Sequence, residues 1–571
     1  MTQKFLKTFN KDSNVNEMWT FLKKRIEEII EKHVPTKMTS KKHQQPWFTT
    51  LTNRLTRKKK RWFQRMKNTN SERVKNKYKE IKRTTQKALR SAHSEYVKNM
   101  ICNDNKDNKK LWTYIKSKRQ EQVGIPDLID DNNKTIKDPK EKANILNNQF
   151  SNVFSNPEPE IICKNNPNLE HAYSQMNAIN VKKEGVLKLL LNIKENKATG
   201  PDGIPGRILK LCAPEIVDAY VLLFQTSLDQ GKEPNDWKDE NIIPIFKKGN
   251  KTKAENYRPV SLTSITCKLL EHIIHSNIMD HLDKNNILNK IQHGFRQKRS
   301  CETQLITTIN DLSNCLNERG QTDAILLDFS KAFDKVDHLG LINKMKNYGI
   351  SDNLIHWTKS FLIGRNQKVT VEGVESNTLR VKSGVPQGTV LGPLFFLLYI
   401  NDINLNLTPG TKMRLFADDS LLYRQIRSTE DCEILQNDLN ILQNWEKKWK
   451  MEFHPQKCQL LTITKKQNPI KAKYYVHGEA LSQTKSAKYL GVIIDSELNW
   501  KDQNKAVCKK ANSILAFLKR NISNCPQPIK EKCYKALVKP ILEYGCCVWD
   551  PHTKKYIEEL EKKPIKTQLG L

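Results

Sequence analysis

No run of apolar residues in this sequence is long enough to cross a bilayer. The longest runs, such as PLFFLLYI at 393–400, fall far short of the roughly 20 residues that a membrane-spanning helix needs. The N-terminal stretch MTQKFLKTFNKDSNVNEMW also lacks the apolar core of a secretory signal peptide. We therefore expect no membrane partner.

Zinc-binding patterns are missing as well. The 13 cysteines include no Cys-x-x-Cys pair, and the adjacent Cys546 and Cys547 are poorly spaced for zinc. An odd number of cysteines in a chain without an export signal predicts reduced thiols in an intracellular protein. No tandem repeat is found, and a length of 571 residues leaves room for about three or four domains.

Acidic residues are scarce relative to basic ones. Lys and Arg number 97 against 62 Asp and Glu, which gives a formal net charge of +35. The excess is concentrated in residues 51–100, where 17 Lys or Arg stand against three Glu. Because cations that neutralise phosphates release condensed counterions, this imbalance favours nucleic acid as a partner.

The basic window also has the periodicity of a helix. Its apolar residues recur at intervals of three, four and eight, on one helical stripe: Val74, Tyr78, Ile81, Leu89, Ala92, Tyr96 and Met100. A basic helix that is merely solvated is the alternative. Aromatic residues that could stack on bases or form a small core interleave with the charges: Trp47, Phe48, Trp62, Phe63, Trp112 and Tyr114.

Farther along, the pattern becomes that of a mixed domain. VGIPDLIDDNN (123–133) is typical of a linker or turn, and an apolar helix follows from 184, with Gly200 and Pro201 as its stop signal. From there to about 495, strand-like runs such as ENIIPIF, DAILLDF, QKVTVEG and LLTIT alternate with helical ones, which predicts an α+β or α/β fold. Residues 506–521 are again helical and basic.

Two short stretches place acids where acids are uncommon. RLFADDSLLYR (414–424) predicts a β-hairpin with strands 414–417 and 420–423 and with Asp418 and Asp419 in the turn. Asp328 ends the apolar run of DAILLDF, at the end of a buried strand. An ordinary turn and an Asp that caps a helix beginning near Ser330 are the structural alternatives.

A shared site would explain both stretches. Three carboxylates brought together by neighbouring strands would raise one another's pKa values unless a cation neutralised them. Oxygen-only ligands suit Mg²⁺, which also accepts phosphate oxygens from a substrate. The arrangement is that of a two-metal site, in which one ion activates a hydroxyl and the other stabilises a leaving pyrophosphate.

The order and spacing of several motifs resemble the reverse transcriptases of non-LTR (LINE-type) retrotransposons of the jockey and CR1 kind. The central motifs are LLDFSKAFDKVDH, SGVPQGTVLGPLFFLLYINDI and LFADDS. Others lie on both sides, namely KATGPDGIPGRILK, IIPIFKKGN, NYRPVSLTSITCKLLE, QHGFRQKRSCETQL, FHPQKC and YLGVIIDSELNW. The resemblance covers roughly residues 190–500.

The resemblance implies roles for individual residues near the two acidic stretches. Asp328, Asp418 and Asp419 correspond to the metal-binding carboxylates, with the backbone carbonyl of Phe329 as a further ligand. Phe333 corresponds to an aromatic gate under the sugar, which would clash with a ribose 2′-hydroxyl and so select deoxynucleotides. Ordinary core packing is the alternative for Phe333.

Five further residues are expected around the incoming nucleotide. Arg258 corresponds to the arginine that grips the triphosphate, and Lys247 and Lys248 offer point charges to the same phosphates. Gln387, in SGVPQG, is expected beside the template base and the nucleotide, where Gly384 and Gly388 would permit close backbone approach. Lys457 corresponds to a lysine that protonates the leaving pyrophosphate.

The fold implied is a right-hand polymerase of the α+β class with a helical, basic N-terminal region. We expect an RNA-binding region at 1–125, a connecting segment at 126–189, fingers and palm at 190–500 and a truncated helical thumb at 501–571. Fingers would span about 190–320 and palm about 321–495. Residues 1–190 offer no endonuclease motif and no ribonuclease H pattern is found, so a fragment or a decaying genomic copy is also expected.

The expected activity is RNA-directed DNA polymerisation. RNA template, DNA primer and dNTPs would be the partners, with two Mg²⁺ ions, or Mn²⁺ as a substitute, as cofactors. An inactive, retroelement-derived RNA-binding protein is the alternative from another class, and an RNA-directed RNA polymerase is a third. The run RKKKR (57–61) would fit nuclear import, although RNA contact would explain it equally well.

Overall fold

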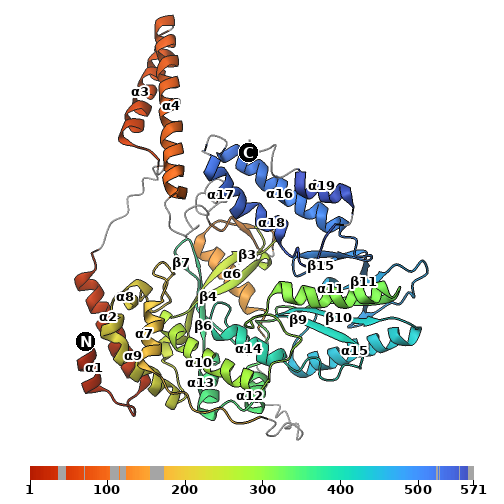
Figure 1. Cartoon of the computed structure of the whole chain (residues 1–571). Coiled ribbons are helices and arrows are strands. Elements are labelled where there is room, and N and C mark those ends of the chain that lie inside the picture. Colours follow the sequence, from red (N-terminus) through yellow and green to blue (C-terminus); the bar gives the residue numbers. More distant parts are fainter. Residues whose placement is uncertain are drawn as a thin grey trace. The chain divides into compact units, whose positions relative to one another are not determined.

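The computed structural model describes most of the chain, in two compact units (Figure 1). The described residues are 1–35, 47–69, 71–102, 115, 124–130, 132–154, 173–522, 525, 527–551 and 553–562. The first unit comprises residues 1–35 and 124–498, and the second comprises 36–123 and 499–571. Helices and sheets occur together in the first unit, which confirms the α+β class. The boundaries expected for the functional segments stay predictions.

The first 35 residues belong to the first unit and not to the basic helices that follow them. Their helices α1 (Thr2–Thr8) and α2 (Val15–His33) pack against α9 (Ala213–Asp229). Trp19 meets the ring of Trp237 edge-on at 5.2 Å, and its indole N–H donates to Asp236 at 2.8 Å. The apolar face of these two helices therefore joins the main core, which separates them from the solvated basic region.

A central five-stranded sheet carries the predicted acidic stretches. Its strand order is β14-β11-β5-β10-β9, with all pairings antiparallel except that of β11 with β14. The strands are β5 (Gln321–Asp328), β9 (Lys412–Phe416), β10 (Asp419–Gln425), β11 (Gln459–Thr464) and β14 (Ser482–Thr484). β5 lies between β10 and β11 and is buried on both faces, as its continuous apolar run predicts.

The two faces of this sheet are covered by different elements. Leu326 and Leu421 line a small cavity together with Leu312 of α11 (Cys301–Asn317) and Tyr489 of a hairpin. That hairpin consists of β15 (Ser486–Tyr489) and β16 (Val492–Asp495), and its turn contains Gly491 with φ +91°, as expected for a tight hairpin turn. Helix α15 (Thr429–Trp449) packs on β10, on the opposite side from α11 (Figure 1).

The hairpin of RLFADDSLLYR is present, but its turn lies one residue earlier than predicted. Strand β9 ends at Phe416 and β10 begins at Asp419, so the turn residues are Ala417 and Asp418. Ala417 has φ +54°, which is unusual for a residue with a side chain. Asp419 is consequently the first residue of a strand and is fixed by the ladder.

A second sheet has the strand order β4-β3-β6-β7, and β8 also pairs with β6. Its strands are β3 (Asp239–Phe246), β4 (Tyr257–Leu262), β6 (Asn366–Val371), β7 (Val374–Glu375) and β8 (Leu379–Arg380). Helix α6 (Pro139–Ser151) packs on β6. The stretch expected to be a linker or turn contains β1 (Leu128–Ile129), which pairs with β2 (Thr135–Ile136), and Leu128 joins the core under α6.

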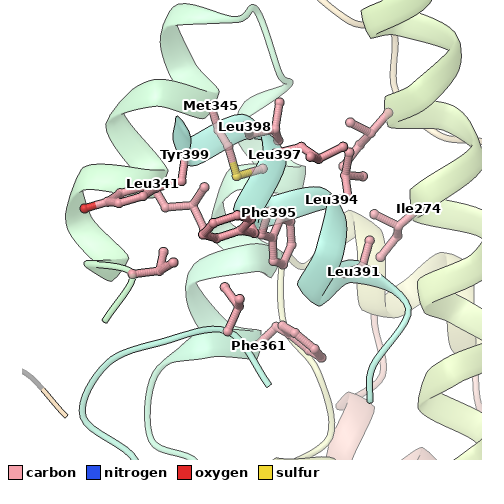
Figure 2. Close-up of a cluster of buried hydrophobic side chains, with 14 of the residues drawn as sticks. Ile274, Leu341, Met345, Phe361, Leu391, Leu394, Phe395, Leu397, Leu398 and Tyr399 are labelled. Carbon is pink, nitrogen blue, oxygen red and sulfur yellow. The ribbon is translucent and has the colours of Figure 1, made fainter. Parts of the chain in front are cut away.

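The main core surrounds α14 (Leu391–Ile400), the helix formed by the longest apolar run. Figure 2 shows Leu394, Phe395 and Leu398 of this helix among side chains of its neighbours. Glu271 accepts hydrogen bonds from the N–H groups of Val390 and Leu391 at 2.6 and 3.0 Å and so caps α14. Further α-helices in the described part of this unit are α7 (Lys183–Leu191), α8 (Gly206–Leu211), α10 (Ile265–Lys284), α12 (His338–Asn347) and α13 (Asp352–Leu362).

In the described part of the second unit, the regular elements are helices. Helices α3 (Thr50–Asn68) and α4 (Glu72–Cys102) form an antiparallel hairpin, which confirms the helix predicted in the basic window. Val97 of α4 joins a small core with residues of α16 (Lys501–Ile522) and α17 (Gln527–Leu537). Helices α18 (Lys539–Glu543) and α19 (Lys554–Lys562) complete the unit. Across both units, no described helix has the length and apolar content required to traverse a bilayer.

Candidate active site

Asp328 and Asp419 are directly opposite one another in the central sheet. Asp328 ends β5, Asp419 begins β10, and the two are register partners in the antiparallel ladder. Directly opposed residues of such a ladder project to the same face with Cβ atoms about 5 Å apart. Both carboxylates therefore lie on the face that carries Leu326 and Leu421, at the end of the sheet.

Asp418 is next to this pair because of the β9–β10 turn. Asp418 occupies the turn itself and is half-buried, whereas Asp419, at the start of β10, keeps more of its surface exposed. Burial raises the pKa of Asp418, and the negative charge of Asp328 raises it further. The sheet and the turn thus place the three residues that the sequence suggested next to one another in the fold, although their side chains do not close into a metal site.

The charges of these carboxylates strongly affect Asp419. Partial loss of hydration, reinforced by the negative charges of Asp418 and Asp328, raises the pKa of Asp419 to about 6. Arg258 and Lys247 lower the pKa values of both hairpin aspartates. A group of acids that is costly to ionise together, beside two cations, is suited to binding a further positive charge.

The backbone at Phe329 is directed by the chain that precedes β11. Ser330 N–H donates to the carbonyl of Glu452, and His454 N–H donates to the carbonyl of Asp328, both at 2.8 Å. Phe329 and Phe453 are therefore a non-hydrogen-bonded antiparallel pair, whose own N–H and C=O groups point away from each other. The carbonyl of Phe329 is thus left on the side of β5 where β10 lies.

The alternative of a helix cap at Asp328 does not hold. Residues 330–335 form turns, and the next helix, α12, begins at His338. Its cap is Asp337, whose carboxylate accepts from the N–H of Gly340 at 2.7 Å. No capping role remains to explain an acid at position 328.

Three cations are within electrostatic reach of the carboxylates, namely Lys457, Arg258 and Lys247. Lys457 pairs directly with Asp328, with Nζ 3.4 Å from Oδ2, and both side chains are about half exposed. Arg258 on β4 and Lys247, just after β3, are held beside each other by the β3–β4 ladder. Loss of hydration lowers the pKa of Lys247, and Arg258, Lys457 and Lys248 lower it further.

Phe333 is held from two sides. Its ring stacks on Phe396 at 4.5 Å between centroids, and the ring of Phe295 meets it edge-on at 6.3 Å. Its carbonyl accepts a hydrogen bond from the N–H of Val385 at 2.8 Å. The ring therefore packs against Phe396 and remains partly accessible, so packing and a gating role are compatible.

The loop of residues 383–388 is fixed by contacts within the chain. The side-chain amide of Gln387 donates to Asp334 at 2.9 Å. The backbone carbonyl of Gln387 accepts from the N–H of Ser261 at 2.7 Å. A Cβ at Gly384 would lie 2.7 Å from the carbonyl oxygen of Asp334, and one at Gly388 would lie 2.7 Å from that of Ser261. The close backbone approach expected at these glycines is thus an approach to the protein itself.

Two residues beside the site were not identified from the sequence. Asp334 anchors Gln387, and Gln292 contacts the β9–β10 turn. Asp334 lies in the motif LLDFSKAFDKVDH, and Gln292 is the first residue of QHGFRQ. Their presence in these two motifs was the sequence feature that could have indicated a role at the site. Within the described residues, no three His, Cys, Asp or Glu side chains are assembled closely enough to hold a metal ion.

Comparison with known proteins agrees with the geometry. Residues 245–494 match the family model described as reverse transcriptase (RNA-dependent DNA polymerase). The chain is 30% identical over 395 residues to the RNA-directed DNA polymerase from mobile element jockey of Drosophila funebris, covering 66% of this chain and 42% of that protein.

Further relatives come from Drosophila melanogaster. Its jockey polymerase is 27% identical over 445 residues, covering 75% of this chain and 48% of the relative. The probable RNA-directed DNA polymerase from transposon BS of the same organism is 30% identical over 387 residues, covering 65% of this chain and 42% of the relative. The chain thus spans less than half the length of these curated relatives. Residues 245–494 thus match the reverse transcriptase family, and the relatives that the chain resembles are named as RNA-directed DNA polymerases of mobile elements.

Proposed function

We propose that this chain is an RNA-directed DNA polymerase that extends the 3′-hydroxyl of a DNA primer on an RNA template. The observation that carries the proposal is the register of Asp328 with Asp419, beside Asp418, inside the segment that matches reverse transcriptases. The reaction is attack by the primer hydroxyl on the α-phosphorus of a dNTP, with release of pyrophosphate. Positioning and electrostatic stabilisation supply most of the rate enhancement.

The oxygen-only chemistry of these donors suits two Mg²⁺ ions, but the side chains would have to draw closer, because no three described His, Cys, Asp or Glu side chains form a metal site as they stand. Asp328, Asp418, Asp419 and the Phe329 carbonyl would hold them, since hard cations prefer oxygen ligands. The raised pKa values of Asp418 and Asp419 are what such ligands exhibit without their cation. When bound, the ions would lower the pKa of the primer hydroxyl and stabilise the charge of pyrophosphate. Mn²⁺ would substitute for Mg²⁺.

The surrounding side chains divide the remaining work. Arg258 would grip the triphosphate with its planar guanidinium, and Lys247 and Lys248 would add positive charge beside it. Phe333 would exclude a ribose 2′-hydroxyl, because its ring is supported by Phe396 and cannot retreat easily. Lys457 would release its carboxylate partner and donate a proton to pyrophosphate. Gln387, with its amide held by Asp334, would lie in the segment beside the template base and the nucleotide.

We also propose that the chain has a right-hand architecture and that the basic hairpin of α3 and α4 binds the template RNA. Helix α3 contains no acidic residue, and five exposed cations lie along one side of it, at helical spacing: Arg54, Arg57, Lys58, Arg61 and Arg65. A stripe of this kind fits a phosphate backbone. Nuclear residence would follow from the same basic run, 57–61.

Primer extension tests the activity. With an RNA template, a DNA primer, dNTPs and Mg²⁺, we expect incorporation that a chelator stops. Asp418→Asn should lower it more than about 100-fold, beyond the loss typical of residues that merely support a metal ligand, and should leave RNA binding unchanged. Asp431→Asn is the matched control, because Asp431 is the acid of the capping box at the start of α15, where it accepts from the N–H of Ser428 and pairs with Arg424 and has no role in the proposed site.

The outcome separates the alternatives. RNA binding that weakens with salt, without any incorporation by the parent, would identify an inactive RNA-binding protein. Incorporation of rNTPs in preference to dNTPs would identify an RNA-directed RNA polymerase. Equal extension by Asp418→Asn and Asp431→Asn would show that the assigned carboxylates are not the catalytic ones.

A further inference from the structure

The segment of residues 291–295 lies against the turn that carries Asp418. It forms a short parallel bridge to β9, in which His293 N–H donates to the carbonyl of Leu415 at 2.9 Å. Leu415 N–H in turn donates to the carbonyl of Ile291 at 3.1 Å. The segment is separated from the turn by more than 120 residues in sequence, so this contact is part of the tertiary structure.

The side chain of Gln292 continues the bridge into the turn. Its Oε1 accepts from the N–H of Ala417 at 2.9 Å and from the N–H of Gly294 at 2.7 Å. Its Nε2 lies 3.4 Å from the carbonyl of Ala417, to which it donates. The side chain is 4% exposed. One buried side-chain amide therefore pairs with both backbone groups of Ala417. Its oxygen accepts from the N–H, and its NH₂ group donates to the C=O, so both a donor and an acceptor are required.

Ala417 is the residue of the turn that needs such support. Its φ of +54° is a left-handed conformation that costs free energy for any residue with a side chain. Asp418 follows it directly, and Asp419 begins the strand. The orientation of the first hairpin carboxylate consequently depends on whether Ala417 keeps this conformation.

The backbone of Gly294 makes the contact tight. A Cβ on Gly294 would lie 2.3 Å from the backbone nitrogen of Ala417, closer than any side chain can approach. The neighbouring Phe295 meets Phe333 edge-on, so the same segment touches the proposed sugar gate. His293 bonds to the hydroxyl of Thr303 in the first turn of α11, at 2.9 Å, which anchors the segment to a helix.

We propose that Gln292 is a positioning residue for nucleotidyl transfer, one that locks the Ala417–Asp418 turn so that the carboxylates are presented in a fixed arrangement. This inference rests on the proposed function. Gln292 does not touch substrate itself; it acts through the turn. Residues 291–295 contact both the turn that carries Asp418 and the ring of Phe333. The same segment would therefore position the metal ligands and the proposed sugar gate relative to each other.

Gln292→Met tests the inference, because methionine has a similar length and neither the donor nor the acceptor. The matched control is Gln367→Met, since Gln367 is equally buried and its amide bonds to Asn147 on α6. Both variants lose a buried amide, so their stability losses should be similar. Only Gln292→Met should alter the turn.

Two measurements are needed. Hydrogen exchange by mass spectrometry on the protein alone should show residues 415–420 of Gln292→Met exchanging about tenfold faster than in Gln367→Met, as expected for loss of one or two hydrogen bonds. In primer extension, kcat of Gln292→Met should fall on the order of 100-fold, as expected for a small misplacement of reacting groups, with the KM for dNTP nearly unchanged.

Each result bears on a different claim. Unchanged exchange at 415–420 overturns the inference, as does a kcat of Gln292→Met equal to that of Gln367→Met. A parent protein that extends no primer contradicts the proposed function. In that case the exchange measurement still tests whether Gln292 fixes the Ala417–Asp418 turn. Should Gln292→Met fail to fold, Gly294→Ala replaces it, because its Cβ must displace the turn; normal exchange and normal kcat there also overturn the inference.

Discussion

At the scale of single residues, Asp419 shows how neighbouring acids control cation binding. Its pKa is raised to about 6 because it is partly desolvated and lies beside Asp418 and Asp328. A metal ion binds the deprotonated carboxylate, so protons compete with it below that pH. We predict that the Mg²⁺ concentration giving half-maximal extension rises steeply as the pH falls below about 6. Mg²⁺ titrations at several pH values measure this.

The raised pKa of Asp419 also affects the stability of the fold when no metal is bound. A carboxyl whose pKa is higher in the folded chain than in the unfolded one destabilises the fold where it is ionised, above about pH 6. The penalty disappears below the unfolded value near 4. Asp419→Asn should therefore melt at a higher temperature than the parent at pH 7.5 and at the same temperature at pH 4. A lower melting temperature at pH 7.5 would contradict the assigned environment.

Phe333 makes a prediction about sugar selection. Its ring stacks on Phe396, so removing it opens space without displacing the backbone at Val385. Phe333→Ala should raise the efficiency of rNTP relative to dNTP incorporation by at least about tenfold, the order of discrimination that a steric contact provides. Competition between rNTPs and dNTPs in primer extension measures the ratio. An unchanged ratio would leave Phe333 as a core residue only.

At the scale of secondary-structure elements, α3 is a helix with charge of one sign. Arg57 and Arg61 lie one turn apart on its exposed side. Replacing both with Gln should make RNA binding less dependent on salt, with the slope of log K against log salt reduced by about 1.4, or 0.7 per lost phosphate contact to a single strand. Lys4→Gln with Lys7→Gln on α1 is the control pair. Equal slopes for the two double variants would exclude α3 from the RNA contact.

The elements also show which parts of the site could be predicted. Asp328 could be placed at a strand end because an apolar run precedes it, and the hairpin followed from two apolar runs around two aspartates. The position of the turn was wrong by one residue, since Asp is a common turn former and nothing local reveals that Ala417 adopts a left-handed conformation. That conformation is supported by Gln292, and such contacts cannot be derived from local sequence.

At the scale of the whole molecule, sequence patterns predicted the class of fold, whereas the grouping of residues into two compact units depends on contacts between residues that are distant in sequence. The alternation of strands and helices predicted α+β, but the association of residues 1–35 with the main core depends on distant partners such as Trp237 for Trp19. The resemblance to the reverse transcriptase family rested on the order of many motifs along the chain. Charge alone suggested only a polyanionic partner.

The central claim for the whole molecule is that Asp328, Asp418 and Asp419 share divalent cations. Anomalous diffraction from crystals soaked in Mn²⁺ tests it most directly. We predict Mn²⁺ peaks within about 2.2 Å of carboxylate oxygens of Asp328 and Asp418, typical of a hard cation with oxygen ligands, with Lys457 displaced from Asp328. Ordered carboxylates without any Mn²⁺ peak between them, in crystals that bind Mn²⁺ elsewhere, would contradict the account.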